Sequence, residues 1–322
     1  MEETVGSTVE TVRGPVPADS LGLTLGHEHL RFRDEAVAFQ WPGRYDEAHE
    51  LARALEAVAL AQSHGVRTIV DPTPMNAGRD FRFMARVSEE TGVHVIGCTG
   101  IYAFTDTTLY FQTRDADQIA DHFVSDIEGD VQGTGARAAF VKVTADVPGL
   151  TEAVEKIHRA AARASVRTGA PVMAHSAPAV DNGPKQAALF MEEGVPAHRI
   201  QICHYGDTTD VDKIEELLAM GVYVGLDRFG GPPPPTLDER CATAAELLRR
   251  GHAERLIVSH DFCPTLDFLP AEMEAGFREA AAGWSTGLVF ERVVPYLREQ
   301  GVLDERAFRT IFHDNPRRWL TG

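Results

Sequence analysis

Cysteine is scarce in this chain, and its spacing excludes both a disulfide framework and the common CxxC metal-binding motifs. The 322 residues include four cysteines, Cys98, Cys203, Cys241 and Cys263, which stand far apart. Such spacing indicates free thiols in a reducing compartment. The N-terminal residues are acidic and lack the apolar segment of a secretory signal, so we expect a cytoplasmic protein.

Long hydrophobic runs and an excess of basic residues are also missing. No apolar run approaches the roughly 20 residues of a membrane-spanning helix, and we expect no membrane insertion. The 31 Lys and Arg residues against 48 Asp and Glu residues give a net charge of −17, which disfavours nucleic acid and anionic membranes as partners. No GxGxxG motif follows the first expected strand, so a Rossmann dinucleotide site lacks support.

What the chain does contain is a regular alternation of short apolar runs and helical patterns. The first apolar run is centred on Leu23, and further expected strands cover residues 66–70, 93–98, 138–143, 171–174, 200–203, 222–226 and 256–259. Eight strand–helix units predict a single (β/α)8 TIM-barrel domain spanning residues 1–322, with its active site at the carboxyl ends of the strands. A doubly wound open sheet is the alternative architecture.

Capping residues mark the expected beginnings of the helices, and glycines mark their expected ends. They cover residues 46–64, 80–91, 115–127, 151–168, 185–193, 210–220, 237–250, 288–300 and 304–313, and a glycine follows most of them. The residues before Leu21 are expected to be an irregular lead-in, and residues 31–44 a loop. The proline run at 232–235 belongs to the loop after the seventh strand.

Two histidines follow the first apolar run at a spacing of two residues. Side chains alternate between the faces of a strand, so His27 and His29 are expected to point one way and Glu28 the other. Two imidazoles on one face suit a borderline metal ion such as zinc. A pair of solvated histidines is the alternative for this motif taken alone.

Residues with polar or charged side chains also stand at the other expected strand ends. They are Lys142 within the fourth strand, His175 after the fifth, His204 after the sixth, Asp227 and Arg228 after the seventh, and Asp261 after the eighth. Each alone has an ordinary structural explanation, such as a helix N-cap for an aspartate. Because the carboxyl ends of barrel strands meet at one mouth, their repetition favours a metal centre. The other histidines, His260 among them, are interpreted as structural.

Lys142 leaves two interpretations open. A buried ammonium beside metal ions is repelled and desolvated, which favours the neutral amine. A neutral amine can take up CO₂ and become a carbamate, an anionic oxygen ligand able to bridge two cations. The alternative is a salt bridge between Lys142 and Asp261.

Residues 22–29 resemble the N-terminal signature of the phosphotriesterase family of the amidohydrolase superfamily. Lys142, His175, His204 and Asp261 match the family's remaining metal ligands in order and strand placement, and the similarity runs from Thr11 to Trp319. The resemblance implies two divalent metal ions, with zinc favoured and cobalt, manganese or iron as alternatives. It implies that carboxylated Lys142 bridges them, that His27, His29 and Asp261 hold the buried ion, and that His175 and His204 hold the exposed one.

Two further positions are similar to those of the phosphotriesterase-like lactonases within this family. A tyrosine occurs as Tyr102 in Gly100-Ile101-Tyr102, and an arginine occurs as Arg228 after Asp227. The resemblance implies that Tyr102 and Arg228 orient the substrate and that Asp261 transfers the proton. Arg228 paired with Asp227 and Tyr102 as an ordinary loop aromatic are the structural alternatives. The loop at residues 262–284 is expected to line the substrate groove with Cys263 and Phe268, the latter at a position where some relatives carry tryptophan.

The resemblance therefore implies lactone hydrolysis, including N-acyl-homoserine lactones, by a hydroxide that bridges two metal ions. It also implies a promiscuous phosphotriesterase activity on organophosphates and assembly as a homodimer. A primary phosphotriesterase, or another ester or amide hydrolase of the superfamily, is the first alternative. The second alternative is a catalytically inactive relative that binds a ligand. Such a protein is expected to have lost at least one metal-binding residue, and this sequence has all of them.

Overall fold

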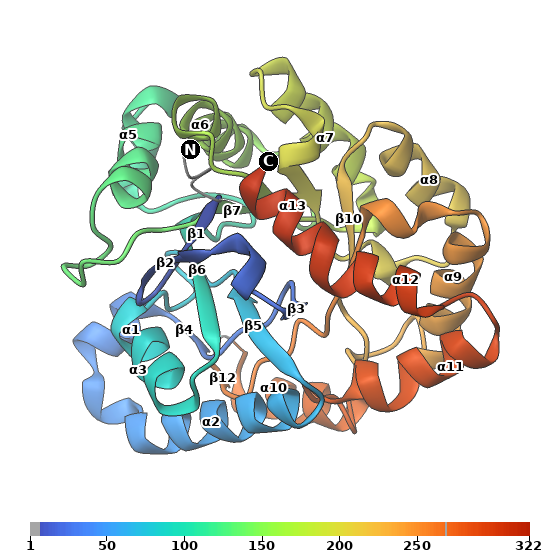
Figure 1. The fold of residues 1–322 in the computed structure, drawn as a ribbon. Helices are drawn as coiled ribbons and strands as arrows, with labels where there is room; N and C mark the ends of the chain where they lie inside the picture. Colours follow the sequence, from blue (N-terminus) through green and yellow to red (C-terminus); the bar gives the residue numbers. More distant parts are fainter. Residues whose placement is uncertain (1–6, 268) are drawn as a thin grey trace, which may run out of the picture.

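The computed structural model describes residues 7–267 and 269–322, and its centre is an eight-stranded parallel sheet. The strands are β3 (Leu23–Leu25), β5 (Val66–Asp71), β6 (His94–Ile101), β7 (Phe140–Thr144), β8 (Val172–His175), β9 (Ile200–Ile202), β10 (Tyr223–Leu226) and β11 (Leu256–Val258). Strands that follow one another along this series pair in the sheet, and helices surround the sheet in Figure 1. This arrangement lacks the reversal of strand order that defines a doubly wound sheet.

The two edge strands of the sheet, β3 and β11, approach each other and nearly close the barrel. A Cβ atom on Gly26 would overlap Ile257 Cγ2, so only glycine allows the two chain segments to approach this closely. Beyond the strands, the Asp261 amide donates a hydrogen bond of 3.0 Å to the His27 carbonyl. The prediction of a (β/α)8 barrel is confirmed, while the extent of a single domain over residues 1–322 stays a prediction.

Helices cover the outside of the barrel. They are α2 (Glu47–Ser63), α3 (Phe81–Thr91), α5 (Ala116–Glu128), α6 (Glu152–Thr168), α7 (Asn182–Glu192), α8 (Val211–Ala219), α9 (Leu237–Arg249) and α11 (Val294–Glu299). The side chains of Asp46, Asp80, Asp115 and Asp210 cap four of them by accepting backbone hydrogen bonds. Among the described residues, no helix combines the length and apolar character needed to cross a bilayer.

The interior of the barrel is packed at its amino-terminal end, which leaves the carboxyl end for a site. Phe140 at the start of β7 lies with its ring centroid 5.3 Å from that of Trp319, and both are buried. Trp319 belongs to α13 (Asn315–Thr321), which crosses this end of the barrel (Figure 1). The preceding segment runs through α12 (Glu305–Arg309) and a π-helical turn (Thr310–Asp314), so the expected end of the last helix at His313 is wrong.

Two N-terminal segments also differ from the prediction. The expected lead-in contains an antiparallel hairpin of β1 (Thr8–Thr11) and β2 (Gly14–Pro17). The expected loop at residues 31–44 contains β4 (Phe32–Arg33), α1 (Glu35–Gln40) and a 3₁₀ turn (Pro42–Arg44). The Asp34 carboxylate accepts a hydrogen bond from the Val37 amide and so starts α1, although none of the α1 residues is buried.

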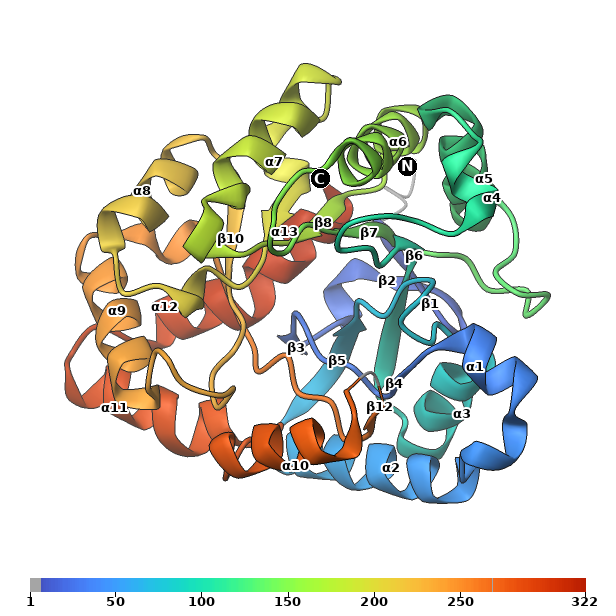
Figure 2. The ribbon, with the colours of Figure 1, turned by 180° about the vertical axis from the view of Figure 1, so that it is seen from behind.

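The long segment after β11 is tied to the segment after β3. Its short strand β12 (Leu266–Asp267) pairs in parallel with β4, and α10 (Ala271–Ala280) follows. Figure 2 shows α10 near α2 at the edge of the barrel, with β4 and β12 side by side above it. The chain then enters α11 through a π-helical turn at Val289–Val293, which agrees with the helix predicted for residues 288–300. A shorter helix, α4 (Leu109–Gln112), follows β6.

Candidate metal centre

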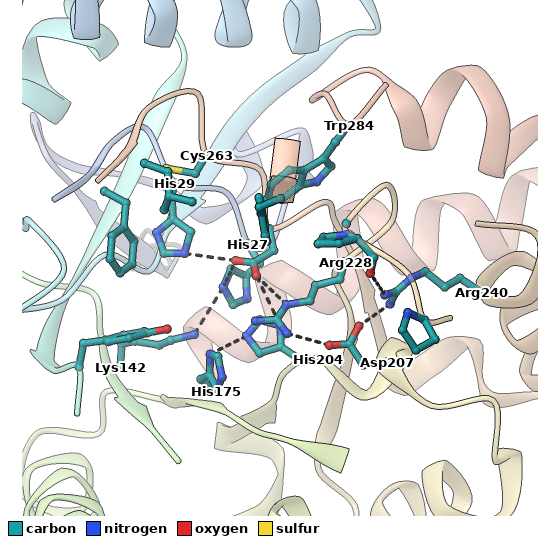
Figure 3. A pocket seen from close by; sticks show the side chains of 18 residues that line it. His27, His29, Lys142, His175, His204, Asp207, Arg228, Arg240, Cys263 and Trp284 are labelled. Carbon is teal, nitrogen blue, oxygen red and sulfur yellow. Dashed lines mark hydrogen bonds and ion pairs between the residues drawn. The ribbon is translucent and has the colours of Figure 1, made fainter. Parts of the chain in front are cut away.

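Asp261 stands between the two histidines of the His-x-His motif. Its Oδ1 atom lies 3.1 Å from His27 Nε2 and 3.2 Å from His29 Nε2. The ligating atoms of these three side chains all lie within 4.8 Å of one another, and the histidines are buried. Figure 3 shows His27 and His29 turned toward the same space in the cleft. This group has the donor set that a borderline divalent ion requires.

The two histidines come just after β3 rather than within it, so their predicted placement on the strand is wrong. β3 ends at Leu25, because the chain leaves the ladder at the close contact of Gly26 with β11. The predicted alternation nevertheless persists beyond the strand. Glu28 points away from the cleft and accepts hydrogen bonds from residues 259–262, while its neighbours face Asp261.

The second pair of histidines lies beside the first group. His204 Nε2 and His175 Nδ1 are 3.0 Å apart, and the ring centroids of His27 and His204 are 5.0 Å apart. His204 has φ of 67°, a left-handed conformation that is unfavourable for a residue with a side chain. The Asp227 carboxylate supports it by accepting a 2.8 Å hydrogen bond from the His204 amide.

The outer nitrogen of each of these imidazoles has a polar partner. Asp227 Oδ2 lies at the ion-pair distance of 3.0 Å from His27 Nδ1 without hydrogen-bond geometry, and Asp227 Oδ1 lies at the hydrogen-bond distance of 2.9 Å from His204 Nδ1. Thr73 Oγ1 lies at hydrogen-bond distance from His29 Nδ1, at 2.6 Å, and Asp146 Oδ2 lies at hydrogen-bond distance from His175 Nε2, at 2.9 Å. A contact to the ring nitrogen that faces away from the cleft fixes the orientation of the imidazole. The other ring nitrogen, which faces the cleft, then stays free for a metal ion.

Sequence reasoning missed these orienting residues, although one signal was available. Asp227 follows a barrel strand and stands among the strand-end residues of the sequence, but no role is predicted for it beyond an ion pair with Arg228. The structure shows that its fully buried carboxylate instead joins His27 to His204. Asp146 and Thr73 lie in loops, and nothing in their sequence context predicts their contacts.

The protonation states of His175, His204 and Asp261 suit metal binding. Burial would lower the pKa of His27, but the nearby Cys203, Asp261 and Asp227 raise it well above its ordinary value. Burial lowers the pKa of His175 to about 4, and burial together with the nearby Arg228 charge places the pKa of His204 well below its ordinary value. Burial alone would raise the pKa of Asp261, but the neighbouring His27, His204 and Arg228 hold it well below its usual range. Neutral imidazoles and an ionised carboxylate are the forms that ligate a cation, so these residues fit a metal centre.

Lys142 reaches the same space from β7. Its side chain is buried, and Nζ lies 3.5 Å from His27 Nε2. A Cβ atom on Gly100, in β6, would overlap the Lys142 carbonyl, so this glycine allows β6 to pack against the lysine. Within the described part of the chain Lys142 makes no ion pair with Asp261, which interacts with His27, His29, His204 and Arg228 instead.

Arg228 binds two carboxylates at the mouth of the cleft. Its Nε donates to Asp261 Oδ2 at 2.8 Å, and its Nη1 donates to Asp207 Oδ2 at 2.7 Å. The alternative pairing of Arg228 with Asp227 is therefore wrong. Asp207 also accepts a hydrogen bond of 2.5 Å from Arg240, which orients it toward Arg228 (Figure 3).

Tyr102 and Cys263 line the same cleft, which holds about 190 Å³ of space. The Tyr102 ring centroid lies 5.9 Å from that of His175 and 5.4 Å from that of Phe32, and burial raises the pKa of its phenol. Cys263 donates from Sγ to the Thr265 carbonyl at 2.9 Å. Phe268, predicted as a further groove residue, lies outside the described residues.

Comparison with known proteins identifies the lineage of this barrel. The model of the phosphotriesterase family matches residues 7–320. The chain belongs to the phosphotriesterase family. It is 41% identical to an aryldialkylphosphatase of Saccharolobus solfataricus, over 95% of this chain and 97% of that protein. It is 37% identical to a phosphotriesterase homology protein of Mycobacterium tuberculosis, over 96% of both chains.

Solved structures agree with this assignment. The structure of the phosphotriesterase from Mycobacterium tuberculosis superimposes with a TM-score of 0.91 and 36% identity, and the match covers 98% of each chain. As a member of the phosphotriesterase family, this protein is a metal-dependent hydrolase that acts on ester bonds of small molecules. More distant relatives include an N-acetyltaurine hydrolase of Danio rerio, at 26% identity over 97% of both chains.

Proposed function

We propose that this hydrolase is a binuclear metal-dependent lactonase with a slower, promiscuous phosphotriesterase activity. The observation that carries the proposal is the placement of Tyr102 and Arg228 in one cleft with Asp261. The Arg228 guanidinium touches the Asp261 carboxylate, and the Tyr102 phenol lines the space beside His175. These are the two positions at which the sequence resembles the lactonases of the family.

In this proposal His27, His29 and Asp261 hold one divalent ion, and His175 and His204 hold the other. Carboxylated Lys142 would be shared between them, because its buried Nζ lies close to His27 and forms no ion pair with any described residue. Zinc is the favoured metal, with cobalt, manganese and iron as alternatives. When bound, such a pair polarises the substrate carbonyl and activates a water molecule as the nucleophile.

Three side chains carry out the proton transfer and stabilise the developing charge in this proposal. Asp261 accepts the proton of the attacking water and passes it to the leaving alkoxide, since its carboxylate is ionised and faces the cleft. Arg228 orients this carboxylate through its 2.8 Å hydrogen bond. Tyr102 stays a phenol because burial raises its pKa, so it can donate a hydrogen bond to the developing oxyanion.

The lining of the cleft suits a lactone that carries an apolar chain. Its apolar residues come from the two loops joined by β4 and β12, which supply Phe32, Leu266, Phe277 and Trp284, and from the loop after β10, which supplies Pro232 and Pro234. An acylated lactone needs one polar subsite for its ring and one apolar wall for its chain.

A substrate comparison tests the proposal. We expect kcat/KM of the metal-loaded enzyme to be at least about tenfold higher for the best member of an N-acyl-homoserine lactone series than for paraoxon, a difference of ~1.4 kcal/mol in transition-state binding. A preference for paraoxon would contradict the lactonase assignment and favour a primary phosphotriesterase. A preference for N-acetyltaurine, included because of the more distant relatives, would favour an amide hydrolase.

We also propose a homodimer. Large apolar side chains are exposed on the α1 and α4 side of the molecule, with Phe39 83% and Leu109 74% accessible. Figure 2 shows α1 and α4 on the same side of the barrel. We expect light scattering after gel filtration to give twice the chain mass, and Leu109→Asp or Phe39→Asp to shift it toward the monomer. A monomeric wild-type protein would contradict the proposal.

The cytoplasmic location likewise stays a prediction.

A further inference from the structure

Glu28, the residue between the two histidines of the His-x-His motif, binds the chain segment that carries Asp261. Its side chain is almost fully buried. Oε1 accepts hydrogen bonds from Ser259 Oγ at 2.8 Å and from the His260 amide at 2.9 Å, and it lies 2.6 Å from His260 Nδ1. Oε2 accepts a hydrogen bond of 3.0 Å from the Phe262 amide. All of these partners belong to residues 259–262.

The backbone amides on either side of Glu28 donate to the same segment. The His27 amide donates to Ser259 Oγ at 3.0 Å, and the His29 amide donates to the Phe262 carbonyl at 2.9 Å. Asp261 itself has φ of 54°, a left-handed conformation that is costly for a residue other than glycine. Such a conformation persists only where the surroundings determine it, and Glu28 holds the residues on both sides of Asp261.

The connection continues from Glu28 to the far end of the substrate loop. A neutral His260 ring with its proton on Nδ1 donates to Glu28 and accepts a 3.0 Å hydrogen bond from the Val289 amide at Nε2. The Trp284 indole donates to the His260 carbonyl at 2.8 Å. Val289 begins the π-helical turn after the loop, and Trp284 lines the cleft. Glu28 therefore links the candidate metal ligands to the wall of the substrate cleft.

We propose that Glu28 is a positioning residue for the metal centre, setting the backbone conformation of Asp261 and the spacing of His27 and His29 through its hydrogen bonds to residues 259–262. The inference rests on the proposed metal site, but it assigns a role to a residue that does not touch the metal. Residues that orient metal ligands typically change metal affinity or activity by about 10- to 100-fold when they are replaced. Glu28 acts on the backbone around Asp261, whereas Asp227 contacts the rings of His27 and His204 and the His204 amide.

The test is the exchange Glu28→Gln in the full chain. An amide has a single accepting oxygen, so its NH₂ group must face either the Phe262 amide or the three donors around Oε1. The matched control is Glu193→Gln on the outer helix layer. The Glu193 carboxylate also accepts two hydrogen bonds, from Arg159 at 2.7 Å and Arg163 at 3.0 Å, but it lies far from the cleft. Zn²⁺ affinity is measured by competition with a chromogenic chelator, and unfolding temperature is measured on the metal-free protein.

We expect Glu28→Gln to raise the Zn²⁺ dissociation constant by about 10- to 100-fold, while Glu193→Gln leaves it unchanged. If Glu28→Gln lowers the unfolding temperature but keeps the wild-type Zn²⁺ affinity, the residue is only structural and the inference is overturned. Should that variant not fold, Ser259→Ala removes one of the four contacts and is expected to weaken Zn²⁺ binding several-fold; unchanged affinity there would equally overturn it. Wild-type protein that binds no Zn²⁺ would contradict the proposed metal site instead.

Discussion

Lys142→Ala should remove bound metal and turnover together, with kcat/KM for the best lactone falling by about 10⁴-fold or more. The physical reason is that the buried amine, as a carbamate, would supply the anionic oxygens shared by both ions. His204→Ala should have the same double effect, because its ring faces His175 and is fixed by Asp227. Elemental analysis and lactone kinetics on the same preparations measure both quantities.

A lysine outside the site provides the control for this experiment. Lys156 on α6 donates from Nζ to the carbonyls of Phe111 and Gln112, at 2.9 and 3.1 Å. Lys156→Ala should therefore keep the wild-type metal content and kcat/KM, apart from a small loss of stability. If Lys142→Ala retained two ions per chain and normal turnover, the assignment of Lys142 as a shared ligand would fail.

Tyr102→Phe should lower kcat for lactone hydrolysis by about 10²-fold while leaving the metal content unchanged. The substitution removes only the phenolic hydroxyl, and the loss of one hydrogen-bond donor to a developing oxyanion typically costs 10²- to 10³-fold in kcat. The ring packing against Phe32 and His175 would remain. Initial-rate kinetics over a range of lactone concentrations separate kcat from KM.

Tyr110→Phe is the matched control for that exchange. The Tyr110 hydroxyl lies 3.0 Å from His122 Nε2 on the outside of the barrel and touches nothing in the cleft. Its removal should leave kcat and KM unchanged. An unaltered kcat in Tyr102→Phe would assign that residue to packing, as an ordinary loop aromatic, and would remove the main support for the lactonase proposal.

The barrel was predictable from the sequence because each unit carries local signals. Short β-branched strands, aspartate caps such as Asp80 and glycine stops such as Gly92 define the alternation without any tertiary information. The hairpin of β1 and β2 was missed because Pro15 and Pro17 interrupt its pattern, although proline is tolerated on such an edge. The helix α1 was missed because it buries no side chain and so has no apolar periodicity.

The candidate site was predictable only in part. Strand ends meet at one mouth, so the positions of His175, His204 and Asp261 in the chain were enough to bring them together. The partners that orient them were not predictable, because contacts such as Asp227 with His27 join distant strands through side-chain geometry alone. The contacts of Glu28 were not predictable either, because all four join it to residues more than 230 positions away in the chain.

The most direct test of the metal centre is a crystal structure of the zinc-loaded enzyme with anomalous scattering measured at the zinc edge. The account predicts two anomalous peaks about 3.5–4 Å apart. One lies among His27, His29 and Asp261, the other lies beside His175 and His204, and a carbamate on Lys142 reaches both. A single peak, peaks elsewhere, or an unmodified Lys142 that points away from both ions would contradict it.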